Sequence, residues 1–375
     1  MAETYDLAVV GAGICGLAHA WAAAKRGLRV IVLERENAAN GASIRNFGFI
    51  TVTGQQQGDT WCRAMRSRDL WQEACQAADI PVVQQGLVMV GQRPEAVPVL
   101  EAFSVTPMGE GCELLAPEGF SRRFPMLRPE RLAGALYSPH ELRVESREAI
   151  PRLAAWLAEA HGVAFRYGVA VRAVAPPQIE TAAGSIEAGA AVVCPGDDFA
   201  SLFPERLVAY GLTRCRLHML RVAPPQQDYR LPAAVMSDLG LVRYLGYAEL
   251  PEAAALRSVL EGEQPEHLAQ GIHLIAVQSG DGSMIIGDSH HYGDPPPPFA
   301  DERVDELILE EFRSVAGIAA PRVIQRWNGT YASASDRTML TDAPAVNVRL
   351  VVISSGTGAS TSFAIGEETI SDLFG

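Results

Sequence analysis

Cysteine and positive charge are both scarce in this chain of 375 residues. It has six cysteines, and none stands in a C-x-x-C pair or in a Cys/His spacing typical of a metal site. We therefore expect free thiols in a reducing compartment and no metal centre. Acidic residues outnumber lysine and arginine by 44 to 31, and the net charge of −13 argues against nucleic acid or an anionic membrane surface as a partner. An anionic substrate would need a local cluster of basic residues.

Long apolar runs are also missing. No stretch approaches the roughly 20 apolar residues of a membrane helix. Residues 7–24 are apolar enough to resemble a secretory signal, but Glu3 and Asp6 precede them where such a signal has positive charge. We therefore expect a cytoplasmic protein with no membrane partner. The sequence leaves its oligomeric state open.

The most informative segment is Gly-Ala-Gly-Ile-Cys-Gly at residues 11–16. A short apolar run of strand length precedes it at 7–10, and a helical pattern follows at 18–25. A strand, a glycine-rich turn and a helix in this order are typical of a dinucleotide-binding site, in which the helix N-terminus faces the diphosphate.

Each glycine of this turn has its own steric role. Gly11 permits the tight turn, Gly13 lets a diphosphate approach the backbone, and Gly16 lets the helix pack close to the strand. Ala12 and Ile14 lie in the same turn, and we count them among the cofactor-binding residues.

A second predicted strand, at 29–33, ends in Glu34, roughly 20 residues beyond the glycines. A carboxylate at this place binds the hydroxyl pair of a ribose. Because an acid would repel a 2′-phosphate, Glu34 favours FAD or NAD over NADP.

The remaining pattern predicts an α/β protein with two sheets. The apolar run at 190–194 ends in a glycine turn and is expected to join the first, parallel sheet, and the later run at 350–353 is expected to be another buried strand before a glycine turn. Four segments alternate as antiparallel strands of a second sheet do. They are residues 217–222, 242–247, 273–277 and 284–287. Amphipathic helices are expected at 59–78, 147–161 and 301–316, and a terminal helix at 364–374.

Several short motifs occur together with the N-terminal turn. They are Gly41-Ala42-Ser43, Val192-Val193-Cys194-Pro195-Gly196, Trp327-Asn328-Gly329 followed by Asp336, and Gly356-Thr357-Gly358. Their order resembles that of the D-amino-acid-oxidase-type FAD-dependent oxidoreductases, in the glycine oxidase and sarcosine oxidase branch. The resemblance covers nearly the whole chain.

This resemblance implies a Rossmann-type FAD-binding domain and an α+β substrate domain with an antiparallel sheet, each made from separate segments. The expected FAD-binding segments are 1–80, 146–212 and 326–375, and the expected substrate segments are 81–145 and 213–325.

The resemblance also assigns the cofactor-binding residues. Glu34 would hold the adenosine ribose and Arg35 would lie on the adenine side. The backbone of Val171 would contact adenine, and Gly196 would allow close approach of the cofactor. Ala42 and Ser43, with Arg45 in the same loop, would touch the diphosphate and the flavin edge. The turn before the last helix would face the pyrimidine end of the flavin through Gly356, Thr357, Gly358, Ala359, Ser360 and Thr361.

The chain departs from the family on the substrate side. Amino-acid oxidases of this group usually carry an arginine shortly after W-x-G that binds the substrate carboxylate, but here Thr330 and Tyr331 follow Gly329. We therefore name Arg45, His290, Tyr331 and Arg337 as candidate catalytic residues. His290 or His291 could add positive charge when protonated. Tyr244 and Tyr247 are interpreted as core or rim residues.

Two motifs resemble those of a narrower subgroup linked to phosphonate catabolism. They are Gly287-Asp288-Ser289-His290-His291-Tyr292-Gly293 and Ser43-Ile44-Arg45-Asn46-Phe47-Gly48. The resemblance implies oxidation of a C–N bond by hydride transfer to flavin N5, followed by imine hydrolysis. The expected substrate is a small anionic amine, 2-aminoethylphosphonate or its N-methyl derivative, with oxygen or an electron carrier as acceptor.

Three other hypotheses remain open. The first is oxidation of glycine, sarcosine or a D-amino acid. The second is a non-catalytic FAD-binding module. The third is an NAD-dependent dehydrogenase, which would give the C-terminal Gly-Thr-Gly turn no role.

Overall fold

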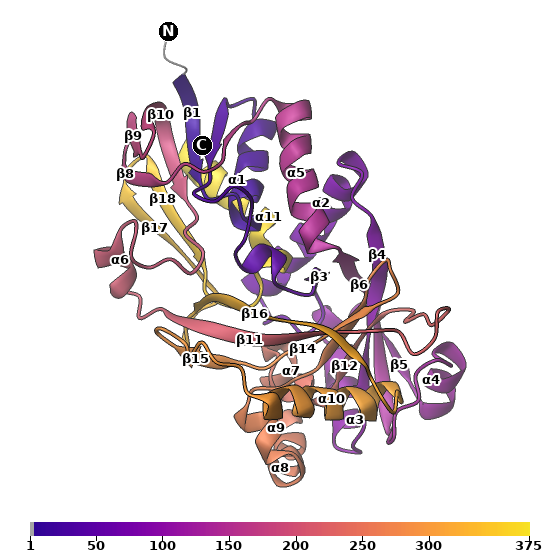
Figure 1. The fold of residues 1–375 in the computed structure, drawn as a ribbon. Coiled ribbons are helices and arrows are strands. Elements are labelled where there is room, and N and C mark those ends of the chain that lie inside the picture. The colour runs from indigo at the N-terminus through magenta and orange to yellow at the C-terminus, as the bar shows by residue number, and fades with distance from the viewer. Residues whose placement is uncertain (1–3) are drawn as a thin grey trace.

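The computed structural model describes residues 4–375. These residues form an eight-stranded sheet and a ten-stranded sheet, which lie in the upper and lower halves of Figure 1. The chain passes between the two halves several times, and its C-terminus lies with β1 in the upper half. This architecture confirms the expected α/β class with an α+β second part. The domain limits drawn from the sequence stay a prediction.

The first sheet has a parallel centre in the order β18-β10-β1-β2-β7, extended by antiparallel strands. Helices α1, α2, α5 and α11 pack together on one face, where Trp21 and Phe363 meet edge to face at 5.1 Å between ring centroids. The strands are β1 (Thr4–Val10), β2 (Val30–Leu33), β7 (Ala164–Arg166), β8 (Val171–Ala175), β9 (Gln178–Thr181), β10 (Gly184–Val193), β17 (Met339–Ala345) and β18 (Val348–Ile353); the helices are α1 (Ile14–Lys25), α2 (Asp59–Ala77), α5 (Ser146–His161), α6 (Pro204–Val208) and α11 (Gly358–Phe374).

The second sheet is antiparallel, as expected, apart from β4 and β12, which pair in parallel. Its strands are β3 (Phe49–Ile50), β4 (Val82–Gly91), β5 (Glu113–Leu115), β6 (Gly134–Val144), β11 (Thr213–Val222), β12 (Ala234–Ser237), β13 (Ile275–Gln278), β14 (Met284–Gly287), β15 (His291–Gly293) and β16 (Val323–Ser333). The helices of this half are α3 (Ala96–Ser104), α4 (Pro117–Arg123), α7 (Leu245–Ala248), α8 (Ala253–Glu263), α9 (Pro265–Ala269) and α10 (Glu302–Ala316), and the short 3₁₀ turns of the chain are η1 (Ala42–Ile44), η2 (Pro107–Gly109) and η3 (Asp238–Val242).

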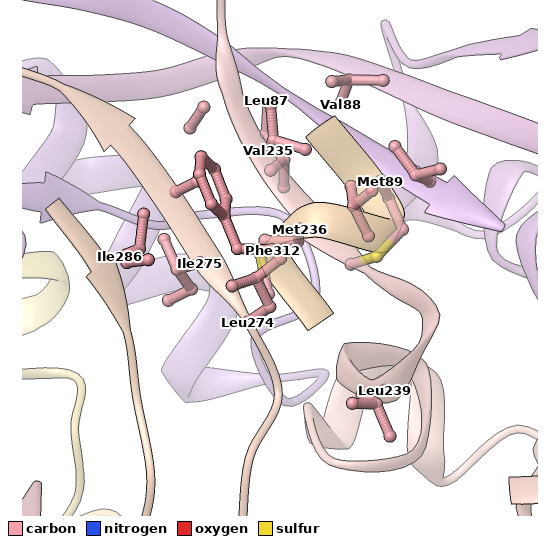
Figure 2. Close-up of a cluster of buried hydrophobic side chains, with 14 of the residues drawn as sticks. Leu87, Val88, Met89, Val235, Met236, Leu239, Leu274, Ile275, Ile286 and Phe312 are labelled. Carbon is pink, nitrogen blue, oxygen red and sulfur yellow. The ribbon is translucent and has the colours of Figure 1, made fainter. Parts of the chain in front are cut away.

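Helix α10 illustrates how the sequence builds the core of the second half. Asp301 caps its N-terminus by accepting a hydrogen bond from the Arg303 N–H, and Gly317 ends it in the left-handed region at φ 70°. Its apolar side chains recur every three or four residues and are buried against the sheet, as predicted. Figure 2 shows Phe312 of this helix among side chains of the central strands, including Val235, Ile275 and Ile286.

Three element predictions are wrong in ways that matter for the site. Residues 242–247 were expected as a strand but form the end of η3 and α7, because the chain turns against the segment at Gly54: the Gly246 N–H donates to the Gly54 carbonyl at 3.0 Å. Helix α1 begins at Ile14 rather than at residue 18. Helix α11 begins at Gly358 rather than at residue 364. Both helices therefore start inside the glycine-rich turns and not after them.

Candidate active site

A cavity of about 1050 Å³ lies where the two sheets meet. Residues of β1, α1, η1, β10 and the turn before α11 line one side. Residues of α7, of the link between η3 and α7, of β16 and of the segments flanking β13 and β14 line the other. We call these sides the nucleotide wall and the substrate wall.

Gly11 and Gly16 have the steric roles predicted for them, and the role of Gly13 toward a diphosphate stays a prediction. Gly11 has a φ of 105°, which favours glycine, and a Cβ there would lie 2.6 Å from the Cys194 carbonyl oxygen. A Cβ on Gly16 would lie 1.8 Å from the Gly11 carbonyl oxygen, so α1 packs against the turn only because Gly16 has no side chain. A Cβ on Gly13 would meet the Ser43 hydroxyl at 2.9 Å.

Glu34 lies beside this turn, at the end of β2. One carboxylate oxygen accepts from the Ala12 N–H at 2.8 Å, and the other accepts from the Glu36 N–H at 3.0 Å. These bonds fix the carboxylate at the cavity wall, where a ribose is expected. Arg35 also lines the cavity and forms an ion pair with Asp198.

Other predicted cofactor residues lie on the same wall. The Ser43 hydroxyl accepts from the Ile14 N–H at 2.9 Å and so joins η1 to the start of α1. Residues Ala42, Arg45, Val171, Gly196, Gly356, Thr357, Gly358 and Ala359 all line the cavity.

The side chains of two predicted cofactor-binding residues, Ser360 and Thr361, do not line the cavity. Ser360 and Thr361 are buried in the first turn of α11. The Ser360 hydroxyl accepts from the Thr51 N–H at 2.9 Å, and the Thr361 hydroxyl donates to the Thr357 carbonyl at 3.0 Å. Their side chains fix the helix start. Because neither residue lines the cavity, their predicted contact with the cofactor stays a prediction.

The nucleotide wall fits a dinucleotide with a diphosphate. Helices α1 and α11 both begin at the cavity, and neither N-cap residue, Gly13 or Thr357, accepts a capping hydrogen bond through its side chain. The Ile14 N–H already donates to Ser43, but the N–H groups that follow it and the positive ends of two helix dipoles suit anionic groups. A side chain on Gly13 would fill the space at the first of these sites.

The candidate catalytic residues all line the cavity, but they differ in whether other side chains already pair with them. Arg45 donates to the Asn40 side chain at 3.1 Å and has no ion pair within residues 4–375. Arg337 is paired with Asp336 (Nε–Oδ1 2.9 Å) and stands over the Tyr210 ring, so its charge is already partnered. The hydroxyl of Tyr331, on β16, lies 3.7 Å from the place where a Cβ of Gly356 would stand.

His290 lines the cavity, but the expectation that it adds a positive charge is wrong. Its Nδ1 bonds the Gly271 carbonyl at 2.8 Å, so its Nε2 carries the lone pair. Burial, followed by the nearby Arg243, holds its pKa well below the usual range for histidine. His291 does not line the cavity, and its Nε2 bonds the Ser289 hydroxyl at 2.9 Å.

The structure adds residues that the sequence prediction missed. Arg243 donates to the Tyr292 hydroxyl at 3.1 Å and forms no ion pair with a carboxylate in the described part of the chain. His273 and Asp288 are buried and face each other, with 3.4 Å between Nδ1 and Oδ1. Tyr244, expected in the core or at the rim, lies 3.3 Å from the other nitrogen of His273 through its hydroxyl.

These residues come from three segments, which is why no local motif pointed to them as a group. Asp288 belongs to the Gly287–Gly293 motif, but nothing in that motif distinguishes it from its neighbours. Tyr247 is fully buried in the core, as predicted.

Burial dominates the electrostatics of the substrate wall. It raises the pKa of Asp288 to about 7, against the opposing effect of Arg243. It holds the pKa of His273 well below the usual range and that of Tyr331 well above it. Near neutral pH both imidazoles are therefore uncharged, Tyr331 keeps its proton, and Arg243 carries the positive charge.

Comparison with known proteins supports this picture. A family model described as FAD dependent oxidoreductase (DAO) matches residues 6–371. Glycine oxidase of Geobacillus kaustophilus is 26% identical over 209 residues, which cover 52% of this chain and 55% of that protein. Monomeric sarcosine oxidase of Streptomyces avermitilis is 29% identical over 228 residues, 57% of each chain. The matches thus span little more than half the length of these curated relatives.

Solved structures share the fold. The crystal structure of glycine oxidase from G. kaustophilus superposes with a TM-score of 0.74, covering 99% of this chain and 94% of that one at 19% identity. That of L-proline dehydrogenase from P. horikoshii gives a TM-score of 0.78, covering 98% and 92% at 18% identity. No helix in residues 4–375 is both long enough and apolar enough to span a membrane.

Proposed function

The chain belongs to the DAO family of FAD-dependent oxidoreductases, and from this premise we propose that it oxidises the C–N bond of a small amine bearing an anionic group. FAD, when bound, accepts the hydride from the carbon next to nitrogen. The resulting imine takes up water and gives a carbonyl compound together with ammonia from a primary amine or methylamine from an N-methyl amine. Oxygen or an electron carrier would then reoxidise the flavin.

The observation that carries this proposal is the unpaired guanidinium of Arg243 in the cavity. A charged group held in a partly buried wall without a counter-ion is costly unless a ligand supplies the opposite charge. Arg243 would therefore bind the substrate anion in place of the arginine that usually follows W-x-G in this family. Arg45, also without an ion pair, would assist from the nucleotide wall.

We propose a phosphonate as the anion, in 2-aminoethylphosphonate or its N-methyl derivative. A phosphonate has three acceptor oxygens and close to two negative charges, and so needs more donors than a carboxylate does. Arg243, Arg45 and the hydroxyls of Tyr292 and Tyr331 supply such a set around one cavity. Both guanidinium groups offer several N–H donors in a fixed plane.

The test is reduction of the enzyme-bound flavin without oxygen, followed by its absorbance, with a panel of amines. We expect 2-aminoethylphosphonate or its N-methyl form to reduce the flavin with a higher kcat/KM than glycine or sarcosine, and a simple alkylphosphonate to compete. Faster reduction by glycine, sarcosine or a D-amino acid would replace the phosphonate with a carboxylate. A flavin that no amine reduces would favour a non-catalytic FAD-binding module.

A further inference from the structure

Asp288 is a carboxyl group that the fold leaves incompletely satisfied. Its side chain is only 6% exposed, it lines the cavity, and its Oδ1 has no hydrogen-bond partner within residues 4–375. Buried polar atoms in proteins almost always have such a partner. The Nδ1 of His273 lies 3.4 Å from this Oδ1 and is also unsatisfied, and the Nε2 of His290 lies 3.9 Å from Oδ2.

Arg243 carries the charge opposite to that of an ionised Asp288 and lies in the same wall of the cavity. Arg243 and Asp288 both line the cavity, yet no ion pair joins them, although they interact electrostatically. Two opposite charges that face one cavity separately are complementary to a zwitterion. Its anion would bind to Arg243 and its ammonium group to Asp288.

Other groups around Asp288 do not compete for this role. His273 before β13 and His290 in its own segment face it, and Tyr244 before α7 and Cys215 on β11 interact with it electrostatically. Tyr331 on β16 and Tyr292 line the same cavity. The imidazoles are neutral near pH 7 because burial lowers their pKa values. Of these neighbours and Arg243, only Arg243 is permanently charged.

We propose that Asp288 is the catalytic group that binds the substrate's ammonium nitrogen and removes one proton from it before the C–H bond breaks. This inference rests on the proposed function, which requires an amine with a free lone pair at the moment of hydride transfer. The N–H bond breaks, its electron pair stays on nitrogen, and the proton passes to a carboxylate oxygen of Asp288. The neutral carboxyl group returns the proton to water when the product leaves.

The alternative is that the amine binds already neutral, without help from a base. The two cases differ in the pH dependence of kcat/KM for flavin reduction, which reports ionisations of the free enzyme and the free substrate. If Asp288 receives the ammonium form, kcat/KM is bell-shaped: it rises as Asp288 ionises near pH 7 and falls when the free amine loses its proton. If the neutral amine binds, kcat/KM rises continuously up to the pKa of the amine.

The experiment measures these profiles by stopped-flow reduction of the holoenzyme, with the amine that reduces the wild type most efficiently. We expect kcat/KM of the wild type to show the bell-shaped pH dependence. We expect kcat/KM of Asp288→Asn to be roughly 100-fold or more lower at pH 7, to lose the ionisation near pH 7, and to rise instead up to the pKa of the amine. Asp288→Glu should keep an acid limb at a shifted pH. Asp281→Asn, an exposed carboxylate outside the cavity, should keep the wild-type bell.

Three outcomes would overturn the assignment. They are a wild-type profile that rises up to the pKa of the amine, a bell that survives in Asp288→Asn, and one tightly bound divalent metal ion per chain lost in that variant. The wild-type profile decides the matter even if a variant does not fold. If no amine reduces the wild-type flavin, the proposed function fails, whereas reduction with the wrong profile removes only the role of Asp288.

Discussion

On the nucleotide wall, the groups available to a ligand are mainly backbone N–H groups at the starts of α1 and α11. On the substrate wall they are side chains, chiefly Arg243 and Asp288, brought together from separate segments. The first wall presents partial charges fixed by helix geometry, which suit a diphosphate of constant shape. The second presents full charges that its neighbours leave unpaired, which suit one particular small zwitterion.

The helix termini show the same division. Asp301 caps α10, which lies away from the cavity, whereas Gly13 and Thr357 leave α1 and α11 without a side-chain cap. A cap would occupy the N–H groups that a phosphate needs. The missing cap residues leave N–H groups of α1 and α11 at the cavity, whereas α3 and α8, which lie away from it, lack side-chain caps for no ligand-related reason.

The largest effect is expected on the nucleotide wall, from Gly13→Leu. The new side chain would meet Ser43 and fill the space for the diphosphate, so the variant should purify without flavin and without absorbance in the visible flavin bands. Gly262→Leu, at an open and exposed helical position, is the matched control and should retain its flavin. A full flavin complement in Gly13→Leu would show that the diphosphate does not bind at this turn.

The next effect tests the unpaired charge of the substrate wall. Arg243→Met should lower kcat/KM for the anionic amine roughly 10- to 150-fold, because a lost charge-assisted hydrogen bond costs about 1.5–3 kcal/mol. Most of the change should lie in KM, with flavin content unchanged. Arg337→Met is the control at the same cavity, and its effect should be smaller because Asp336 already pairs with this arginine. Equal losses in the two variants would contradict the distinction between free and partnered arginines.

A smaller effect concerns stability. Burial raises the pKa of Asp288 from 3.8 to about 7, so between these values the folded protein holds a proton that the unfolded chain has released. Wild-type stability therefore falls as the pH rises through this window, by at most about 1.4 kcal/mol per pH unit, and Asp288→Asn removes this dependence. The Tm of Asp288→Asn relative to wild type should be higher at pH 7 than at pH 5. A difference that does not vary with pH would mean that Asp288 is not desolvated in the folded protein.

The smallest effect is expected where a helix serves only the fold. Asp301→Ala should destabilise the protein by about 1 kcal/mol through loss of the α10 cap, and Asp301→Ser should restore most of it. Thermal unfolding measures this change, and kcat/KM for flavin reduction should stay at the wild-type value. A large kinetic change in Asp301→Ala would mean that α10 influences the cavity.

The sequence by itself determined the nucleotide wall. Gly11, Gly13, Gly16 and Glu34 lie within one strand–turn–helix–strand unit, where the spacing along the chain fixes the spacing in space. Their predicted roles in the turn could therefore be checked residue by residue. The starts of α1 and α11 were displaced because a glycine-rich stretch predicts a loop, although glycines also permit a helix to begin inside it.

Only the tertiary structure decided the substrate wall. Arg243 lies in a segment predicted as a strand, and packing of Gly246 against Gly54 made it a helical turn that directs the arginine to the cavity. Asp288 and His273 meet because β13 and β14 pair in antiparallel register. The sequence shows that these residues can ionise. Which of them is charged near neutral pH depends on how deeply each is buried and on whether it has an ion-pair or hydrogen-bond partner. Those properties depend on contacts between distant segments, and no local pattern encodes them.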